Sequence, residues 1–243
     1  MRRRLLSVAF AATLFATGAQ AMDRAEFWSI IASSQVETAT ERAERIARCH
    51  ASIAVNPCME EAARLQDLQR ARLRTALSAL PADEVAAFSQ HFDDVHADAF
   101  RWDIHGAASI LMVGASDDVF TYFVSWLIAQ GRTIYDAVLR DPEALASYAT
   151  PTEEVMGFEA IGYVAMDVLA TQHGRDPDDA AQWRDPVREL GGEPLRSSEL
   201  PKRFPKLHAY VAEWERRAPH EVRSVRETMR AMQADIDRLI RPR

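Results

Sequence analysis

Leucines recur at helical spacing between Met59 and Leu80, and this stripe limits the fold more than any other feature of the sequence. The segment EEAARLQDLQRARLRTALSAL places these leucines among charged residues. Apolar positions three and four residues apart share one face of an α-helix. The chain also has only 9 Gly and few runs of β-branched residues. Its fold is therefore predicted to be all-α, a compact multi-helix bundle with a C-terminal helical extension.

Start signals and periodic apolar residues predict further helices. Asp23 and Glu26 form a capping box before a first short helix. Pro81 opens a helix whose apolar residues continue at helical spacing past Arg101, and Ser116 is a suitable N-cap for the next helix. The other helical patterns cover about 36–48, 59–80, 133–139, 152–173, 206–217 and 221–239, with a loop-rich crossing at 175–206.

The first 21 residues predict export from the cytoplasm. Three arginines precede an apolar run that ends in Ala19-Gln20-Ala21, which is the order of a secretory signal peptide cleaved after Ala21. The alternative is a membrane anchor, but the apolar run is shorter than the roughly 20 residues that a spanning helix needs. We expect a periplasmic or extracellular protein without a stable membrane anchor. Its core domain would cover residues 22–174, and a loop-rich crossing with a packed helical hairpin would cover 175–243.

The charge of the chain argues against nucleic acid as a partner. The formal net charge is −7, and removal of the three arginines of the signal peptide takes it to −10. An acidic surface repels phosphate backbones. We therefore expect an unidentified protein or a small-molecule ligand as the partner, and the sequence implies no particular cofactor.

The two cysteines, Cys49 and Cys58, bracket a short segment between two helical patterns. In an oxidising compartment they are expected to form a disulfide that closes a helical hairpin. The alternatives are two free thiols or metal ligation together with His50, although the spacing is not that of a known zinc site.

Several consecutive motifs resemble one bacterial family. The motifs are FWSII, RWDIHGAA, SDD, WLIAQGR and DPEALA. In their order and spacing they are similar to the family catalogued as domain of unknown function 4240. The similarity extends from Phe27 to about Leu145 and becomes loose as far as Gly174. The resemblance implies no activity, ligand or catalytic residue.

Three positions depart from the pattern expected for that family. His105 replaces a tryptophan, Ala115 replaces a cysteine and Val124 replaces an arginine. The loss of a free thiol suits an exported protein, whereas the loss of the arginine weakens any anion site shared through that position. The hairpin at Cys49 and Cys58 and the residues after about Gly174 are expected to be additions to the family pattern.

A polar stripe is predicted beside the apolar one if residues 88–105 form a single helix. This stripe carries His91, Asp94, Asp98, Arg101 and His105. Imidazole and carboxylate groups at this spacing can hold a divalent metal, and the candidate ligands are His91, Asp94 and Asp98. The alternative is a solvated helix face with an ion pair between Asp98 and Arg101.

A second constellation combines aspartates with an arginine. Asp103 lies at the border of the apolar stripe, Asp117 and Asp118 follow a helix N-cap, and Arg132 closes the next helix. Paired carboxylates in a cleft could position water or a metal for hydrolysis, with Arg132 holding an anionic substrate and His105 as a further candidate. The same residues serve equally well as helix caps and ion pairs.

The sequence contains no nucleophile elbow, phosphate loop or zinc-protease helix. Caps and packing explain the motif residues well. The leading hypothesis is therefore a non-catalytic periplasmic binding or interaction protein. The rival is a hydrolase of unknown substrate that uses the clustered aspartates and Arg132, with or without a metal.

Overall fold

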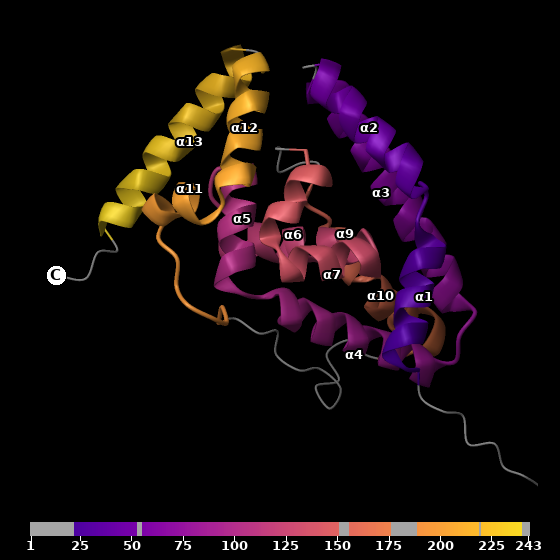
Figure 1. Cartoon of the computed structure of the whole chain (residues 1–243). Helices are drawn as coiled ribbons and strands as arrows, with labels where there is room; N and C mark the ends of the chain where they lie inside the picture. The colour runs from indigo at the N-terminus through magenta and orange to yellow at the C-terminus, as the bar shows by residue number, and fades with distance from the viewer. Residues whose placement is uncertain (1–21, 53–54, 151–155, 176–188, 219, 240–243) are drawn as a thin grey trace, which may run out of the picture.

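The computed structural model describes residues 22–52, 55–150, 156–175, 189–218 and 220–239. Within these ranges the chain forms helices and one isolated β-bridge, so the all-α prediction is confirmed. In Figure 1 the paired helices α2 and α3 lie along one side of the molecule and α12 and α13 along the other, with α5, α6 and α7 between them. The predicted signal peptide lies outside the described residues.

The N-terminal part consists of four helices: α1 (Arg24–Ser34), α2 (Ala39–Ser52), α3 (Val55–Ser78) and α4 (Ala82–Ala99). The predicted capping box starts α1, since the Asp23 carboxylate accepts from the backbone N–H of Glu26 and the Glu26 carboxylate accepts from that of Asp23. The leucine stripe of α3 is buried at Leu73 and Leu77. Leu68 remains exposed, while Cys58 and Ala62 are the buried residues in the N-terminal half of α3.

The middle of the chain contains six short elements: α5 (Trp102–Met112), α6 (Asp117–Ala129), α7 (Arg132–Arg140), the 3-10 helix η1 (Pro142–Ser147), α9 (Glu159–Gly162) and α10 (Val164–His173). The predicted N-cap is confirmed, because the Ser116 hydroxyl accepts from the N–H of Val119. Gly131 separates α6 from α7 with φ at +89°, a conformation that favours glycine.

The prediction of one helix running past Arg101 is wrong. The helix α4 ends at Ala99, and Arg101 adopts an extended conformation before α5 begins. The backbone groups freed by this break bond to Gly191, whose N–H donates to Phe100 and whose carbonyl accepts from Trp102. Gly191 lies far away in the sequence, yet it provides the hydrogen bonds that the backbone groups at the break need. Helical periodicity alone could not predict this partner.

The C-terminal part contains η2 (Ser197–Glu199), α11 (Leu200–Arg203), α12 (Pro205–Arg217) and α13 (His220–Leu239). The helix α12 packs against α5 and η1, so the C-terminal hairpin lies on the middle of the bundle.

Aromatic contacts join the first helix to the core. The rings of Phe27 and Phe88 lie 4.9 Å apart and join α1 to α4. The rings of Trp28 and Tyr135 lie 5.1 Å apart and join α1 to α7. These contacts fix α1, and with it the segment that leads into α2, on the bundle.

Candidate functional site

The candidate acid Asp103 lies beside an arginine at the start of α5. Both oxygens of its carboxylate accept from Arg101, at 3.0 and 2.7 Å, and Arg101 also donates to the Leu139 carbonyl at the end of α7. Asp103 further accepts from the N–H of Ile104. These bonds join the start of α5 to the end of α7. Asp103 therefore has a structural role, whether or not it also takes part in catalysis.

The other candidates for hydrolysis lie at opposite ends of α6. Asp117 and Asp118 are exposed in its first turn, while Arg132 is exposed at the start of α7 and pairs with Asp136 at 3.4 Å. A helix of 13 residues is about 20 Å long, so the structure does not bring these aspartates and Arg132 together. A hydrolytic site built from them stays a prediction.

The candidate metal ligands each have another partner. His91 bonds through Nε2 to the Met22 carbonyl at 2.8 Å, Asp94 accepts from Gln90, and Asp98 pairs with Arg24 at 2.6 Å. His105 lies on α5, beyond the helix break. Among the described residues, no three His, Cys, Asp or Glu side chains come close enough to hold a metal ion.

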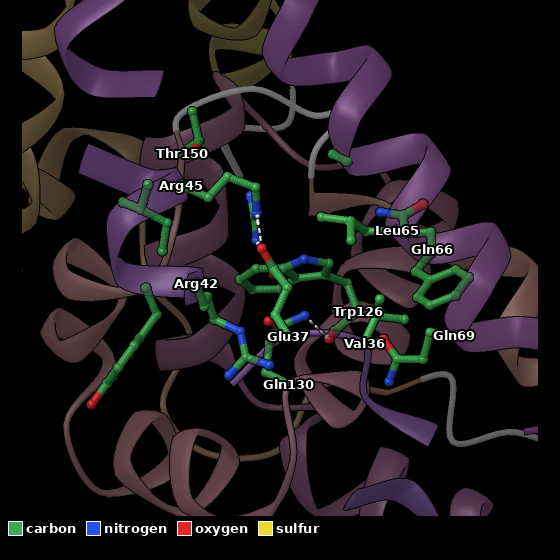
Figure 2. Close-up of a pocket in the computed structure, with 14 residues that line it drawn as sticks. Val36, Glu37, Arg42, Arg45, Leu65, Gln66, Gln69, Trp126, Gln130 and Thr150 are labelled. Carbon is green, nitrogen blue, oxygen red and sulfur yellow. Dashed lines mark hydrogen bonds and ion pairs between the residues drawn. The ribbon is translucent and has the colours of Figure 1, made fainter. Parts of the chain in front are cut away.

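A pocket lies between the α2–α3 hairpin and the middle of the bundle (Figure 2). Its empty volume is about 540 Å³, part of which is open to solvent. The side chains that line it come from α2 and the segment before it, from α3, from α6 and from the segments after η1. They are Val36, Glu37, Arg42, Arg45, Ile46, Ala62, Leu65, Gln66, Gln69, Trp126, Gln130, Tyr148, Thr150 and Phe158.

Arg42 is the most unusual of these lining residues. Only 9% of it is exposed, and its guanidinium makes no hydrogen bond or ion pair with any residue that the structure describes. Burial lowers the pKa of Arg42, while the nearby Glu37 carboxylate raises it and Arg45 lowers it. An arginine stays protonated under all ordinary conditions, so a largely buried positive charge lines the pocket.

Thr150 provides a second polar group without a partner. Only 4% of the residue is exposed, and its hydroxyl oxygen is buried with no hydrogen bond to any part of the structure that is described. A buried hydroxyl that makes no hydrogen bond costs about 1 to 3 kcal/mol. The pocket therefore contains one buried hydroxyl and one largely buried arginine side chain, and neither makes a hydrogen bond to a described residue.

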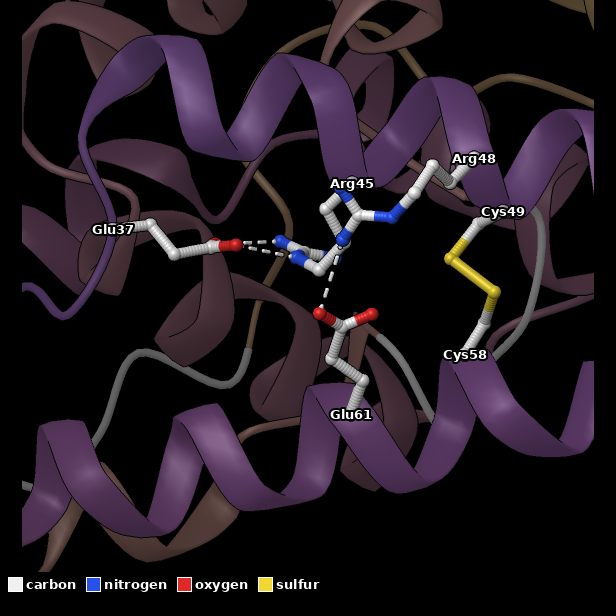
Figure 3. The surroundings of a disulfide bond; sticks show 6 residues. All are labelled: Glu37, Arg45, Arg48, Cys49, Cys58 and Glu61. Atoms are coloured by element: carbon white, nitrogen blue, oxygen red, sulfur yellow. Dashed lines mark hydrogen bonds and ion pairs between the residues drawn. A yellow bond between two sulfur atoms is a disulfide. The ribbon is translucent and has the colours of Figure 1, made fainter.

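The remaining charges in the pocket neutralise each other. The Arg45 guanidinium donates to both oxygens of Glu37, at 2.8 and 3.0 Å, and this pair is largely buried. Figure 3 shows the pair on the same hairpin as the disulfide of Cys49 and Cys58. The predicted disulfide is thus present. It joins α2 to α3 beside the turn of the hairpin, and α2 also carries Arg42 and Arg45. The side chain of His50 lies outside the described residues.

Glutamines anchor the hairpin to α6. The side-chain amides of Gln35 and Gln69 both donate to the Ala129 carbonyl, at 3.2 and 2.9 Å. The Gln130 amide donates to the Trp126 carbonyl at 3.1 Å, and Trp126 is 5% exposed. These bonds satisfy carbonyls at the C-terminal end of α6 and form one wall of the pocket.

Reasoning from the sequence did not identify Arg42, Arg45 or Thr150. One signal was available for the arginines: Arg42, Arg45, Ile46 and Cys49 recur at spacings of three and four residues. Arginines that share a helix face with an apolar residue and a disulfide are in an unusual place, because charged residues are seldom buried without partners. Thr150 lies in an irregular segment and gave no such signal.

The comparisons define the class of protein only at the level of its family. The fold and the pocket together describe an all-α protein with a basic cavity beside a disulfide-linked helical hairpin. A family model described as "Protein of unknown function (DUF4240)" matches residues 54–170, and this segment of the chain belongs to that family. No curated protein and no solved structure shows significant similarity to the chain.

The family match covers only part of the pocket. Its α3 and α6 walls lie inside residues 54–170, whereas Arg42 and Arg45 precede them. Two of the three departures from the family pattern touch each other, because His105 Nε2 donates to the Ala115 carbonyl at 3.0 Å. The third, Val124, is fully buried in α6.

A helix that spans a membrane must be both long enough and apolar enough. In the described part of the chain no single helix meets both requirements, while α5 and α6 meet them only as a pair bent by 98°. Both helices are buried in the bundle over most of their apolar residues.

Proposed function

We propose that this protein is a non-catalytic binding protein that holds a small ligand in the pocket between α2, α3 and α6. The observation that carries the proposal is the largely buried side chain of Arg42, whose guanidinium makes no hydrogen bond or ion pair with a described residue and whose nitrogen atoms are not fully buried. A cation that loses part of its contact with water loses part of its hydration free energy. A ligand that supplies the missing partner would recover that loss as binding free energy.

The place of action that we propose is outside the cytoplasm. Three arginines followed by an apolar run begin the chain, and the disulfide of Cys49 and Cys58 suits an oxidising compartment. The ligand would then be a molecule present in the periplasm or the medium.

Binding in this pocket does not require the candidates for hydrolysis. Asp103, Asp117, Asp118 and Arg132 are absent from the residues that line it. The pocket instead combines six apolar side chains with eight polar or charged ones, so it offers a ligand both apolar contact and hydrogen-bonding groups.

The test is thermal melting of the protein without residues 1–21 against a library of small acids, bases, alcohols and sugars. Ala62 is buried in the pocket wall and Ala63 is exposed beside it on the same helix. We expect a compound that raises the melting temperature of the wild type and of Ala63→Phe but not of Ala62→Phe.

The proposal is wrong if no compound raises the melting temperature of the wild type. It is also wrong if the compounds that do so raise the melting temperature of Ala62→Phe by the same amount. If Ala62→Phe does not fold, Leu65→Trp fills the pocket from a half-buried position on the same wall. The same criterion then applies to that variant.

A further inference from the structure

We infer that the ligand is a small organic acid with a single carboxylate and an apolar body, and that its carboxylate pairs with Arg42. This inference rests on the proposed function, because it names the class of ligand for the same pocket. It is carried by the charges of the lining residues, by the shape of the guanidinium and by the apolar walls.

The charges of the pocket favour one negative charge on the ligand. Three charged side chains line it, and two of them, Glu37 and Arg45, are joined by two hydrogen bonds. Arg42 is left as a single excess positive charge. A dianion such as phosphate would bring a second negative charge near Glu37, which has no spare cation beside it in the described pocket, and like charges repel strongly in a partly buried site.

The guanidinium favours a carboxylate over other monoanions. Its planar set of N–H groups matches the two oxygens of a carboxylate and binds them with two parallel hydrogen bonds. The same geometry already occurs in this pocket, where Arg45 holds Glu37. A ligand carboxylate on Arg42 would reproduce that arrangement.

The rest of the lining favours an apolar body. Six of the 14 lining side chains are apolar and offer contact to such a body: Val36, Ile46, Ala62, Leu65, Trp126 and Phe158. The glutamine amides of Gln69 and Gln130 already donate to backbone carbonyls of α6. The cavity volume is only about 40 Å³, since the 540 Å³ of empty space includes open solvent, so the pocket encloses only a small ligand or a small part of a larger one.

The position of Arg42 also indicates which part of the chain sets this preference. Arg42 lies before the segment that matches the family, while the opposite wall with Trp126 and Phe158 lies within it. The helix α2 therefore adds the acid-binding group to a wall that the family domain supplies.

The experiment compares matched probes by isothermal titration calorimetry. The probes are phenylacetate, its neutral analogue phenylacetamide, hexanoate and inorganic phosphate. The proteins are the wild type, Arg42→Met and Arg70→Met. Arg70 is an exposed residue of α3 that pairs with Asp67, so Arg70→Met controls for the loss of one positive charge.

We expect phenylacetate or hexanoate to bind the wild type and Arg70→Met equally. Affinity should fall at least tenfold in Arg42→Met, and phenylacetamide should bind the wild type at least tenfold more weakly than phenylacetate. Arg42→Lys keeps the positive charge but loses the planar set of N–H donors. Its affinity for the acid should therefore lie between those of the wild type and Arg42→Met. It also serves as the test variant if Arg42→Met does not fold.

Three results would overturn this inference and leave the proposed function intact. The first is a library compound that raises the melting temperature of the wild type but not of Ala62→Phe, while neither acid binds. The second is equal affinity of the wild type for phenylacetate and phenylacetamide. The third is tighter binding of phosphate than of either acid. Failure of every library compound would instead overturn both.

Discussion

Arg226 Nη1 donates to the Leu111 carbonyl at 2.9 Å and thereby joins the last helix to the end of α5, across 115 residues of sequence. Its Nη2 reaches the Ile110 carbonyl at 3.4 Å, its Nε pairs with Glu215, and its guanidinium lies over the Trp214 ring. The carbonyls at a helix C-terminus lack partners within the helix and carry partial negative charge. A buried arginine therefore holds the C-terminal hairpin on the bundle.

Arg226→Leu should destabilise the protein by about 3 kcal/mol, because it leaves two helix-end carbonyls without their donor and removes the buried partner of Glu215. Urea denaturation measures the loss. Hydrogen exchange should increase chiefly in α12 and α13. Arg230→Leu is the matched control, since Arg230 contacts the same Glu215 but is about half exposed. Equal effects of the two variants would show that burial of Arg226 contributes nothing.

Removal of the disulfide should weaken both stability and the pocket. The two cysteines are 9 residues apart, and a loop of this length corresponds to about 2 to 3 kcal/mol of stabilisation. Cys49→Ser with Cys58→Ser should therefore melt at a lower temperature and bind any ligand of the wild type more weakly, because α2 carries Arg42. Reducing agent should lower the melting temperature of the wild type but not that of the double variant. Unchanged binding by the double variant would show that α2 is held without the disulfide.

A methyl group at Gly131 should be poorly tolerated. Gly131 has φ at +89°, and a Cβ added there would lie 2.6 Å from the Gln35 amide nitrogen, which donates to Ala129. Gly174 also has positive φ but has nothing within 4 Å. We expect Gly174→Ala to cost about 1 kcal/mol, from its backbone conformation alone. Gly131→Ala should cost clearly more in chemical denaturation, and equal costs would show that Gln35 moves aside freely.

Acidification should destabilise the protein through two half-buried histidines. Burial lowers the pKa of His96 and of His105 below the ordinary value of 6.5, although their bonds to the carbonyls of Thr121 and Ala115 raise it. The unfolded chain then binds protons before the folded one, so these residues reduce the free energy of unfolding as pH falls below 6.5. Unfolding measured from pH 8 to pH 5 should show this decrease, and His96→Gln with His105→Gln should make it shallower. An identical slope in the double variant would contradict the prediction.

Asp103→Asn tests the hydrolase hypothesis directly. Its pair with Arg101 is about one third exposed, and such pairs contribute at most about 1 kcal/mol. We therefore expect a small decrease in the free energy of unfolding and no effect on ligand binding in the pocket. Turnover of a phosphoester, peptide or glycoside library by the wild type, lost in Asp103→Asn, would instead favour the hydrolase.

Local patterns in the sequence were enough to determine the helical class, the disulfide and the family. The capping box at Asp23 and the N-cap at Ser116 each depend on neighbouring residues only, so they could be identified before the structure was known. The paired cysteines and the consecutive motifs are likewise local signals.

Tertiary structure alone decided where the chain breaks after Phe100 and which charges are buried. The break depends on Gly191, the burial of Arg226 depends on the end of α5, and the burial of Arg42 depends on the wall formed by α6. Each of these involves a partner distant in the sequence. The cost of burying a polar group is set by what surrounds it in space, and the order of residues along the chain does not contain that information.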